Sequence, residues 1–404
     1  MMNGDNEFSY AMNSLIQIAT YISFKVMKIE RDLHMMKGDG EYSYAKNSMI
    51  QRRAVLATRP ILQKAVREVC RDLHPQLMVI ADLGCSSGKN TLLFVSEVLN
   101  TICESPTSTL NKEESPMEVQ FFLNDLHGND FNHVFQSLEQ LEQSTRQECA
   151  CRGLQPPPYY VAGLPGSFYA RLFPCSSVHL FHSSMSVTWL SQVPEHLGCL
   201  NEGNVHVGAT TQPAVARLYQ DQFEKDFSRF LHMRCREIVA GGRMVLTLVG
   251  RKREDVFDAG RTTKIFELLS QGLRTLVSEG RLEKEKLDSF NIPVYCPSTE
   301  ELKQLVQQNG LLHITDIHLF EMDGSPTDES PESADAAVAA AQAAGESMSA
   351  TLRASTEPLI VSHFVESILE DLFALFARNF TSYIESEDEQ SGIFVITMSL
   401  EAKH

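Results

Sequence analysis

One segment, LMVIADL followed by GCSSG, constrains the fold of this chain more than any other. Residues 77–83 form an apolar strand with an acidic residue, Asp82, near its end, and a helical pattern, TLLFVSEVLNTI, begins soon after the turn. Gly84 and Gly88 let the backbone of the turn, which includes Ser87, approach a ligand closely. Such a turn lies at the crevice where open α/β sheets bind nucleotides. The segment therefore predicts a ligand site at the end of this strand.

The same turn limits the kind of nucleotide that it can bind. Its glycines are four residues apart, so the G-x-G-x-x-G dinucleotide fingerprint is absent, which disfavours a dehydrogenase. Asn90 stands where a P-loop needs Ser or Thr to hold magnesium. A nucleoside with an amino-acid tail fits better than a pyrophosphate. The next strand ends at Asn124-Asp125, where a carboxylate can accept hydrogen bonds from both ribose hydroxyls; the alternative is an Asp that caps a turn.

Apolar strands alternate with helical patterns along most of the chain. The strands expected after the first are 118–126, 157–164, 177–190, 241–251 and 392–400. Near-continuous apolar strands separated by helices predict an α/β fold with a doubly wound, mostly parallel sheet. Within this fold we expect an α/β core over 27–255, a mainly helical cap over 256–385 and a final strand in 386–404 that returns to the sheet. The acidic and Ala-rich interval 323–350 is expected to be a mobile loop in the cap, with a nascent Ala helix as the alternative for its second part.

The N-terminal region contains an internal repeat. Residues 2–17 return at 36–51 with 11 of 16 positions identical. The second copy runs directly into a helical apolar pattern, with Val55, Leu62, Val66 and Val69 on one face, whereas the first copy does not. We therefore interpret 36–51 as the working copy and 1–26 as an extra segment, for which a disordered extension is the simplest explanation.

Composition limits the kinds of partner that this protein can bind. The 404 residues carry a formal charge of -17, which repels phosphate backbones and anionic lipid, so neither nucleic acid nor a membrane surface is expected as a partner. The nine cysteines form no CxxC pair and indicate a reducing compartment. The chain has no apolar run as long as a membrane span, which predicts a cytoplasmic protein.

The single tryptophan, Trp189, follows a candidate strand. A buried indole N–H usually seeks an oxygen, although a core Trp is the alternative. His127, His179 and His182 have no metal-ligand spacing and are interpreted as structural or surface residues.

Seven blocks now support a family resemblance. They are, in order, SYAKNSMIQ, ADLGCSSG, FFLNDLHGNDFN, AGLPGSFYARLFP, HSSMSVTWLSQVP, GGRMVLTLVGRKRED and SFNIPVYCPS. Over 27–404 the chain resembles the plant carboxyl methyltransferases of the SABATH family, which act on salicylate, benzoate, jasmonate and indole-acetate. The resemblance implies the class I methyltransferase type of α/β sheet with a helical cap. It also implies S-adenosylmethionine (SAM) as the methyl donor, and it allows a homodimer.

The resemblance also implies roles for individual residues. The SAM contacts would come from Ser48, Asp82, Asn90, Asp125, Leu126, Ser167 and Phe168, with Asp125 on the ribose. Gln51 and Trp189 would bind the substrate carboxylate, and its apolar part would contact Met185, Thr188, Leu248, Leu352 and Ser355. Some members carry a structural Mg²⁺, for which Asp255 and Phe257 are the nearest counterparts.

Four positions depart from the usual family pattern. Family members often have Tyr or Ser in place of Met185 and His or Met in place of Thr188, both beside the pocket. Lys89 and His127 each stand at a position that is usually proline. The resulting hypothesis is an O-methyltransferase that forms the methyl ester of a small carboxylic acid, benzoate- or salicylate-like. Jasmonate- or indole-acetate-like acids stay open, as do N-methylation of a purine and a catalytically silent acid binder.

Overall fold

The computed structural model describes residues 33–104, 117–197, 200–322, 334–386 and 392–403 and contains one seven-stranded sheet. The strand order is β3-β2-β1-β4-β5-β7-β6. The first five strands in this order are parallel, whereas β7 pairs antiparallel with both β5 and β6. This is the predicted doubly wound, mostly parallel sheet. The strands are β1 (Leu77–Leu83), β2 (Glu118–Asp125), β3 (Tyr159–Pro165), β4 (Val178–Ser184), β5 (Ile238–Val249), β6 (Leu312–Met322) and β7 (Ile393–Ala402).

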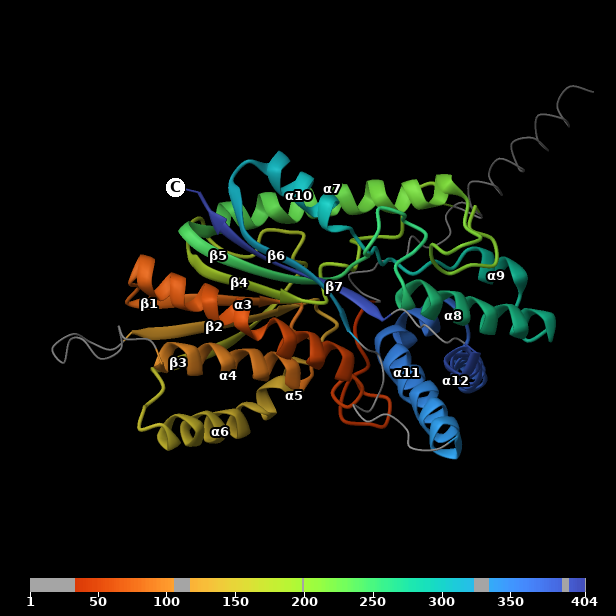
Figure 1. Cartoon of the computed structure of the whole chain (residues 1–404), viewed down its shortest axis with the longest axis horizontal. Coiled ribbons are helices and arrows are strands. Elements are labelled where there is room, and N and C mark those ends of the chain that lie inside the picture. Colours follow the sequence, from red (N-terminus) through yellow and green to blue (C-terminus); the bar gives the residue numbers. More distant parts are fainter. Residues whose placement is uncertain (1–32, 105–116, 198–199, 323–333, 387–391, 404) are drawn as a thin grey trace, which may run out of the picture.

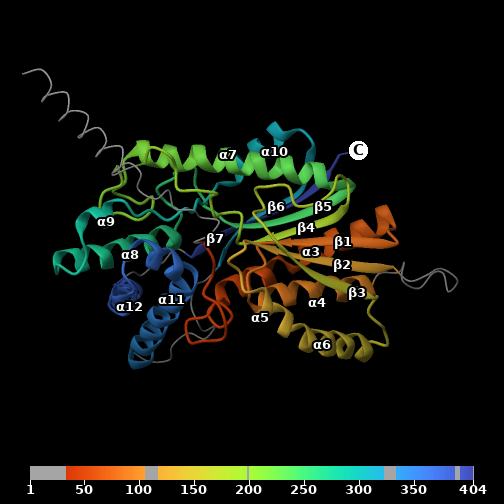
Figure 2. The same ribbon diagram turned by 180° about the vertical axis from the view of Figure 1, so that it is seen from behind.

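Helices cover both faces of the sheet (Figures 1 and 2). One face carries α3 (Met49–Leu73), α4 (Lys89–Cys103), α5 (Phe131–Gln136) and α6 (Leu138–Cys151). The other carries α7 (Pro213–Glu237) and α10 (Thr299–Asn309). The four apolar positions predicted for the first helix, Val55, Leu62, Val66 and Val69, are all buried in α3. The helical prediction there is confirmed.

A group of helices beyond one end of the sheet forms the cap (Figure 1). It consists of α8 (Arg261–Ser278), α9 (Lys284–Asp288), α11 (Ala334–His363) and α12 (Leu369–Ser386), with a short 3₁₀ turn at Glu366–Ile368. The cap has its own apolar core, in which Leu273, Leu359 and Phe376 are fully buried. None of the described helices is long and apolar enough to cross a bilayer.

Three intervals differ from the predictions. The interval expected to be mainly helical also contains β6, an edge strand of mostly half-buried residues that pairs with β7. The interval 323–350 is helical from residue 334 onward, since alanine favours helix and α11 packs on α12; residues 323–333 lie outside the described residues. The strand predicted over 177–190 ends at Ser184 because Met185 adopts a left-handed φ of 62°.

The second copy of the repeat, residues 36–51, connects the α/β core with the cap. The amide of Met36 donates to the carbonyl of Ala354 on α11, and the Arg353 guanidinium lies 3.8 Å from the centre of the Tyr42 ring. The copy then leads into α3, as expected of the working copy. The first copy and the rest of 1–26 lie outside the described residues.

Asn124, fully buried at the end of β2, joins three strands. Its backbone oxygen accepts hydrogen bonds from the amides of Gly84 and Cys85, just after β1. Its side-chain amide donates to the carbonyls of Leu164 and Gly166, at the end of β3, at 2.8 and 2.9 Å. One residue thus holds the ends of β1, β2 and β3 together.

We expect Asn124→Asp to destabilise the protein by about 2–5 kcal/mol, because the carboxylate cannot donate to the two carbonyls and buries a charge beside them. The matched control is Gln120→Glu on the same strand, whose amide also bonds two carbonyls but lies partly in solvent. The urea concentration at the midpoint of unfolding should fall for Asn124→Asp and barely change for Gln120→Glu. Equal shifts would contradict the role given to Asn124.

Candidate functional site

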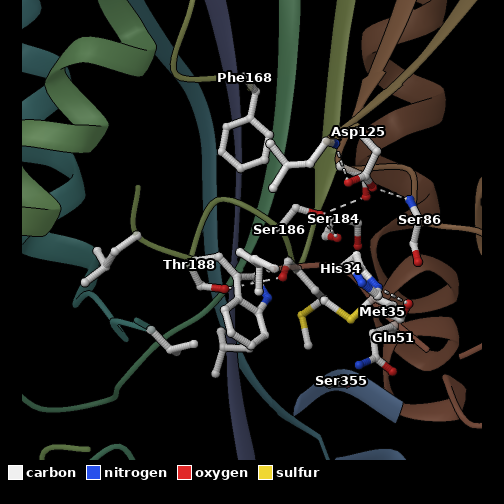
Figure 3. Close-up of a pocket in the computed structure, with 18 of the residues that line it drawn as sticks. His34, Met35, Gln51, Ser86, Asp125, Phe168, Ser184, Ser186, Thr188 and Ser355 are labelled. Atoms are coloured by element: carbon white, nitrogen blue, oxygen red, sulfur yellow. Dashed lines mark hydrogen bonds between the residues drawn. The ribbon is translucent and has the colours of Figure 1, made fainter. Parts of the chain in front are cut away.

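A cavity lies between the carboxyl ends of the central strands and the cap, with about 1160 Å³ of space when the open solvent at its mouth is included. Figure 3 shows Asp125 beside Ser86 in one part of it, with Gln51 and Ser355 in another. Residues that are far apart in the sequence, from the second repeat copy to α11, therefore form one site.

Five residues predicted for the cofactor line this cavity: Gly84, Asp125, Leu126, Ser167 and Phe168. The Asp125 carboxylate accepts hydrogen bonds from the amides of Ser86 and Leu126, each at 2.7 Å. Burial raises the pKa of Asp125 to about 6, and the two amide donors only partly oppose this. A carboxyl of this kind, at the end of the second strand, gains stabilisation when a ligand donates hydrogen bonds to its ionised form.

Gly84 shows why a glycine is required in the turn. Its φ is +79°, and a Cβ built on it would lie 2.3 Å from the Ser186 side chain. The Ser186 hydroxyl instead donates to the Gly84 carbonyl at 2.9 Å. The loop after β4 can therefore lie directly against the turn after β1, which brings the two parts of the cavity together.

Five residues predicted for the substrate also line the cavity: Gln51, Met185, Thr188, Trp189 and Ser355. Three lining residues carry a buried polar atom that has no hydrogen-bond partner within the described structure: the Gln51 Oε1, the Ser86 Oγ and the Ser184 Oγ. Buried polar groups normally have partners, so these atoms indicate a ligand with polar groups of its own.

The cavity wall is nearly uncharged. Among the described residues, its lining includes no Lys or Arg, and its ionisable side chains other than tyrosine are His34 and Asp125. Apart from His34, the side-chain donors that this wall offers to an anionic ligand are neutral.

Four residues predicted to contact the cofactor are not among those that line the cavity in the described structure. Asp82 is buried and its two oxygens already accept bonds from Thr91 and His182, both at 2.7 Å. Asn90 donates to the carbonyl and hydroxyl of Ser48, the residue before α3. Ser87 is buried in the turn, and its hydroxyl has no partner within the described residues. Their contact with the cofactor stays a prediction.

Two residues predicted to line the cavity do not line it, and the periodicity of the strand or helix that carries each one explains why. Leu248 is fully buried in the core on the α7 side of the sheet, and its neighbour Val249 lines the cavity, because successive strand residues point to opposite faces. Leu352 packs in the cap core, whereas Ser355, one helical turn later, lines the cavity. On the strand, a shift of one residue in alignment decides which side chain lines the cavity.

Sequence reasoning missed several residues that line the cavity. They come mainly from the segment before α3, from the loops after β3 and β4, and from the cap: His34, Met35, Tyr44, Asn129, Tyr169, Ser184, Ser186, Val249 and Phe266. The repeat was the available signal for Tyr44, since the motif SYAKNS places it four residues before Ser48. Nothing in the local sequence marks the others.

The residues named for magnesium lie in the loop after β5. The Asp255 carboxylate accepts a bond from the Phe257 amide at 3.0 Å. The described residues contain no group of three or more His, Cys, Asp or Glu side chains that could hold a metal ion. A lone carboxylate is a poor match for the several oxygen ligands that Mg²⁺ prefers. The magnesium site stays a prediction.

Residues 30–402 match the family model described as SAM-dependent carboxyl methyltransferase. The chain belongs to this family. It is 45% identical to anthranilate O-methyltransferase 1 of Zea mays, covering 92% of this chain and 98% of the relative, and 46% identical to a benzoate O-methyltransferase of the same species, covering 89% and 96%. A solved structure described as loganic acid methyltransferase with SAH superposes with a TM-score of 0.76 at 30% identity, covering 92% of this chain and 99% of that one.

The family membership explains the two-part cavity. The protein is a SAM-dependent carboxyl methyltransferase of the SABATH family, so it must bind a sulfonium-bearing nucleoside and an organic acid together. The Asp125 end of the cavity has the strand-end carboxylate expected for the nucleoside, and the Gln51 end has neutral polar groups.

The raised pKa of Asp125 predicts a pH-dependent affinity for the cofactor product SAH. Ribose hydroxyls that donate to Asp125 favour its ionised carboxylate. The affinity for SAH should therefore be high above pH 6 and should fall toward tenfold per pH unit below about 6. Calorimetry at pH 5, 6 and 7.5 measures this. Asp125→Asn, which cannot ionise, should bind more weakly with no such slope; an equally steep slope in this variant would assign the titration to another group.

Proposed function

We propose that this methyltransferase esterifies a compact aromatic acid of the benzoate, salicylate or anthranilate type. The observation that carries this proposal is that Gln51 and Trp189 line the same cavity as the Gly84 turn and Asp125. An amide and an indole are donors without charge. They suit a carboxylate placed beside a nucleoside site.

The proposed clamp consists of one helix residue and one loop residue. Gln51 lies in the first turn of α3, and its amide oxygen is buried without a partner in the described structure, so the amide is not committed to the protein. The Trp189 backbone is held firmly: its amide donates to the Ser186 carbonyl at 3.0 Å, and its carbonyl accepts from the Tyr169 hydroxyl at 2.7 Å. The Gln51 amide is therefore available to a ligand, and the indole is carried on a backbone that is held in place.

The residues of the cavity mainly bind, orient and exclude water. Bound SAM supplies an electrophilic methyl group. A small carboxylic acid is ionised at neutral pH, so no side chain needs to act as a general base. Neutral donors orient the carboxylate without the strong pairing that Arg would give to the starting anion, whose charge is lost during transfer. Placement of this kind can contribute about 7–11 kcal/mol.

The wall opposite the polar groups supports an aromatic substrate. The apolar side chains Met185, Val249, Phe266 and Val294 line the cavity, together with the Trp189 ring. The relatives named as anthranilate and benzoate methyltransferases share 45–46% identity with this chain, which also favours a benzoate-like acid. The larger jasmonate- and indole-acetate-like acids are the alternative.

Two departures from the family pattern, Lys89 and His127, lie outside the cavity. Lys89 begins α4 with its side chain exposed, His127 is also exposed, and neither lines the cavity. They therefore give no support to a catalytically silent binder. A cytoplasmic homodimer stays a prediction of the sequence, which light scattering and cell fractionation would test.

Transfer of labelled methyl from SAM to a panel of acids tests the substrate class. We expect benzoate, salicylate or anthranilate to give the highest kcat/KM, because the apolar wall matches a single ring. Jasmonate and indole-acetate, each at the same concentration, are the comparison. A higher kcat/KM for either would contradict the proposed class, and binding of acids without turnover would identify a sequestering protein.

Removal of either neutral donor should weaken the clamp. We expect Gln51→Ala and Trp189→Phe each to lower kcat/KM for the best acid about 10- to 100-fold, since each removes a donor worth about 1–3 kcal/mol to a buried anion. The affinity for SAH should change less than about twofold. The control is Gln63→Ala in the same helix, whose amide bonds Glu97 outside the cavity. Full activity in both donor variants would refute the clamp.

A further inference from the structure

The two loops that form the cavity are tied to one helix and to each other. The loop after β3 contributes Ser167 and Phe168 to the cofactor end, and the loop after β4 contributes Thr188 and Trp189 to the substrate end. Helix α7 lies outside the cavity but presents three buried ionisable side chains toward these loops: Asp226, Arg234 and Glu237.

The first loop is held by a buried ion pair. The Arg234 guanidinium and the Glu237 carboxylate lie 2.8 Å apart and are both fully buried. Arg234 donates to the carbonyls of Phe168 and Ala170, at 3.2 and 2.8 Å. Glu237 accepts from the amides of Leu172 and Phe173, at 2.6 and 2.9 Å. Burying an ion pair is costly, so the bonds to the loop indicate a role in fixing its conformation.

The second loop is held two turns earlier on the same helix. The Asp226 carboxylate accepts from both the amide and the hydroxyl of Ser191, at 2.8 and 2.7 Å. Residues 226 and 234 are separated by roughly 12 Å along an α-helix. The helix therefore sets the spacing between the cofactor loop and the substrate loop.

Tyr169 closes this arrangement by joining the two loops directly. It follows Phe168, its ring packs edge to face against Phe168 with centroids 4.8 Å apart, and its hydroxyl donates to the Trp189 carbonyl at 2.7 Å. Burial raises the pKa of the Tyr169 phenol well above its ordinary value, and Asp226 adds to this, so the hydroxyl keeps its proton as a donor.

We propose that Tyr169 is a positioning residue for methyl transfer, which sets the Trp189 indole relative to the cofactor wall by bonding the Trp189 carbonyl. It need not touch the reacting atoms, since it acts through the backbone of Trp189. The proposal rests on the role proposed above for Trp189 in binding the acid. The new element is that Tyr169, on the cofactor loop, fixes the position of Trp189 at the substrate end of the cavity.

The test is Tyr169→Phe, which keeps the ring and removes only the hydroxyl. We expect kcat/KM for the best acid to fall about tenfold or more, while Kd for SAH stays within about twofold because Arg234 still holds the loop. Trp189 is the only tryptophan in the chain, so intrinsic fluorescence reports on this one indole. Its anisotropy should fall, and its response to acid should weaken.

A matched control separates positioning from general stability. The Tyr219 hydroxyl, on α7, is also buried and donates to a backbone carbonyl, that of Ile292, at 3.1 Å. Tyr219→Phe should lower the melting temperature to a similar extent, with wild-type anisotropy and wild-type kcat/KM.

The outcomes distinguish this inference from the proposed function. Wild-type kcat/KM and anisotropy in Tyr169→Phe would overturn the positioning role, as would a rise in Kd for SAH as large as the loss in kcat/KM. If the wild-type protein methylates the acid while saturating acid leaves its tryptophan emission unchanged, Trp189 lies outside the acid site. The clamp and this inference then both fail, whereas the esterification itself stands. If emission responds and Trp189→Phe loses activity, a negative result with Tyr169→Phe refutes this inference alone.

Discussion

The hydrogen bonds made by Asn124 at the ends of three parallel strands are the constraint on which the site depends. Parallel strands leave polar backbone groups at their carboxyl ends, where no helix or neighbouring strand pairs with them. Asn124 satisfies four such groups, from the turn after β1 and from the end of β3. The Gly84 turn, the Asp125 carboxylate and the loop beginning at Gly166 are thereby fixed relative to one another, before any ligand binds.

The rest of the cavity is supplied by elements that the sheet alone does not position. Gln51 comes from the start of α3, Ser355 from the cap, and Trp189 from the loop after β4. The cap core and the bonds between residues 33–48 and α11 hold them over the strand ends. Because the chain carries a net charge of -17 and the described wall includes no Lys or Arg, attraction of an acid depends on local hydrogen bonds and not on the field of the whole protein.

The parts of this molecule that could be predicted are those with a local signal. Apolar strands, the glycine turn and the spacing of Val55, Leu62, Val66 and Val69 specify their structure from neighbouring residues. The strand β6 was missed because most of its residues are half-buried and only its pairing with β7 makes it a strand. Which of Leu248 and Val249 meets the cavity depends on strand parity, which a family resemblance across variable sequence does not resolve. The bond from Tyr169 to Trp189 joins loops 20 residues apart, so only the fold reveals it.

The position of the last strand has a consequence for how the chain acquires its structure. β7 lies between β5 and β6 and pairs antiparallel with both, although some seventy residues separate it from β6. During synthesis β5 and β6 leave the ribosome first and have no strand between them. Until β7 emerges, β5 has one unpaired side and β6 has no partner strand, and such exposed backbone edges favour association with other chains. The sheet therefore closes only after residues 393–402 have been synthesised, and until then the nascent chain exposes strand edges that other chains can pair with.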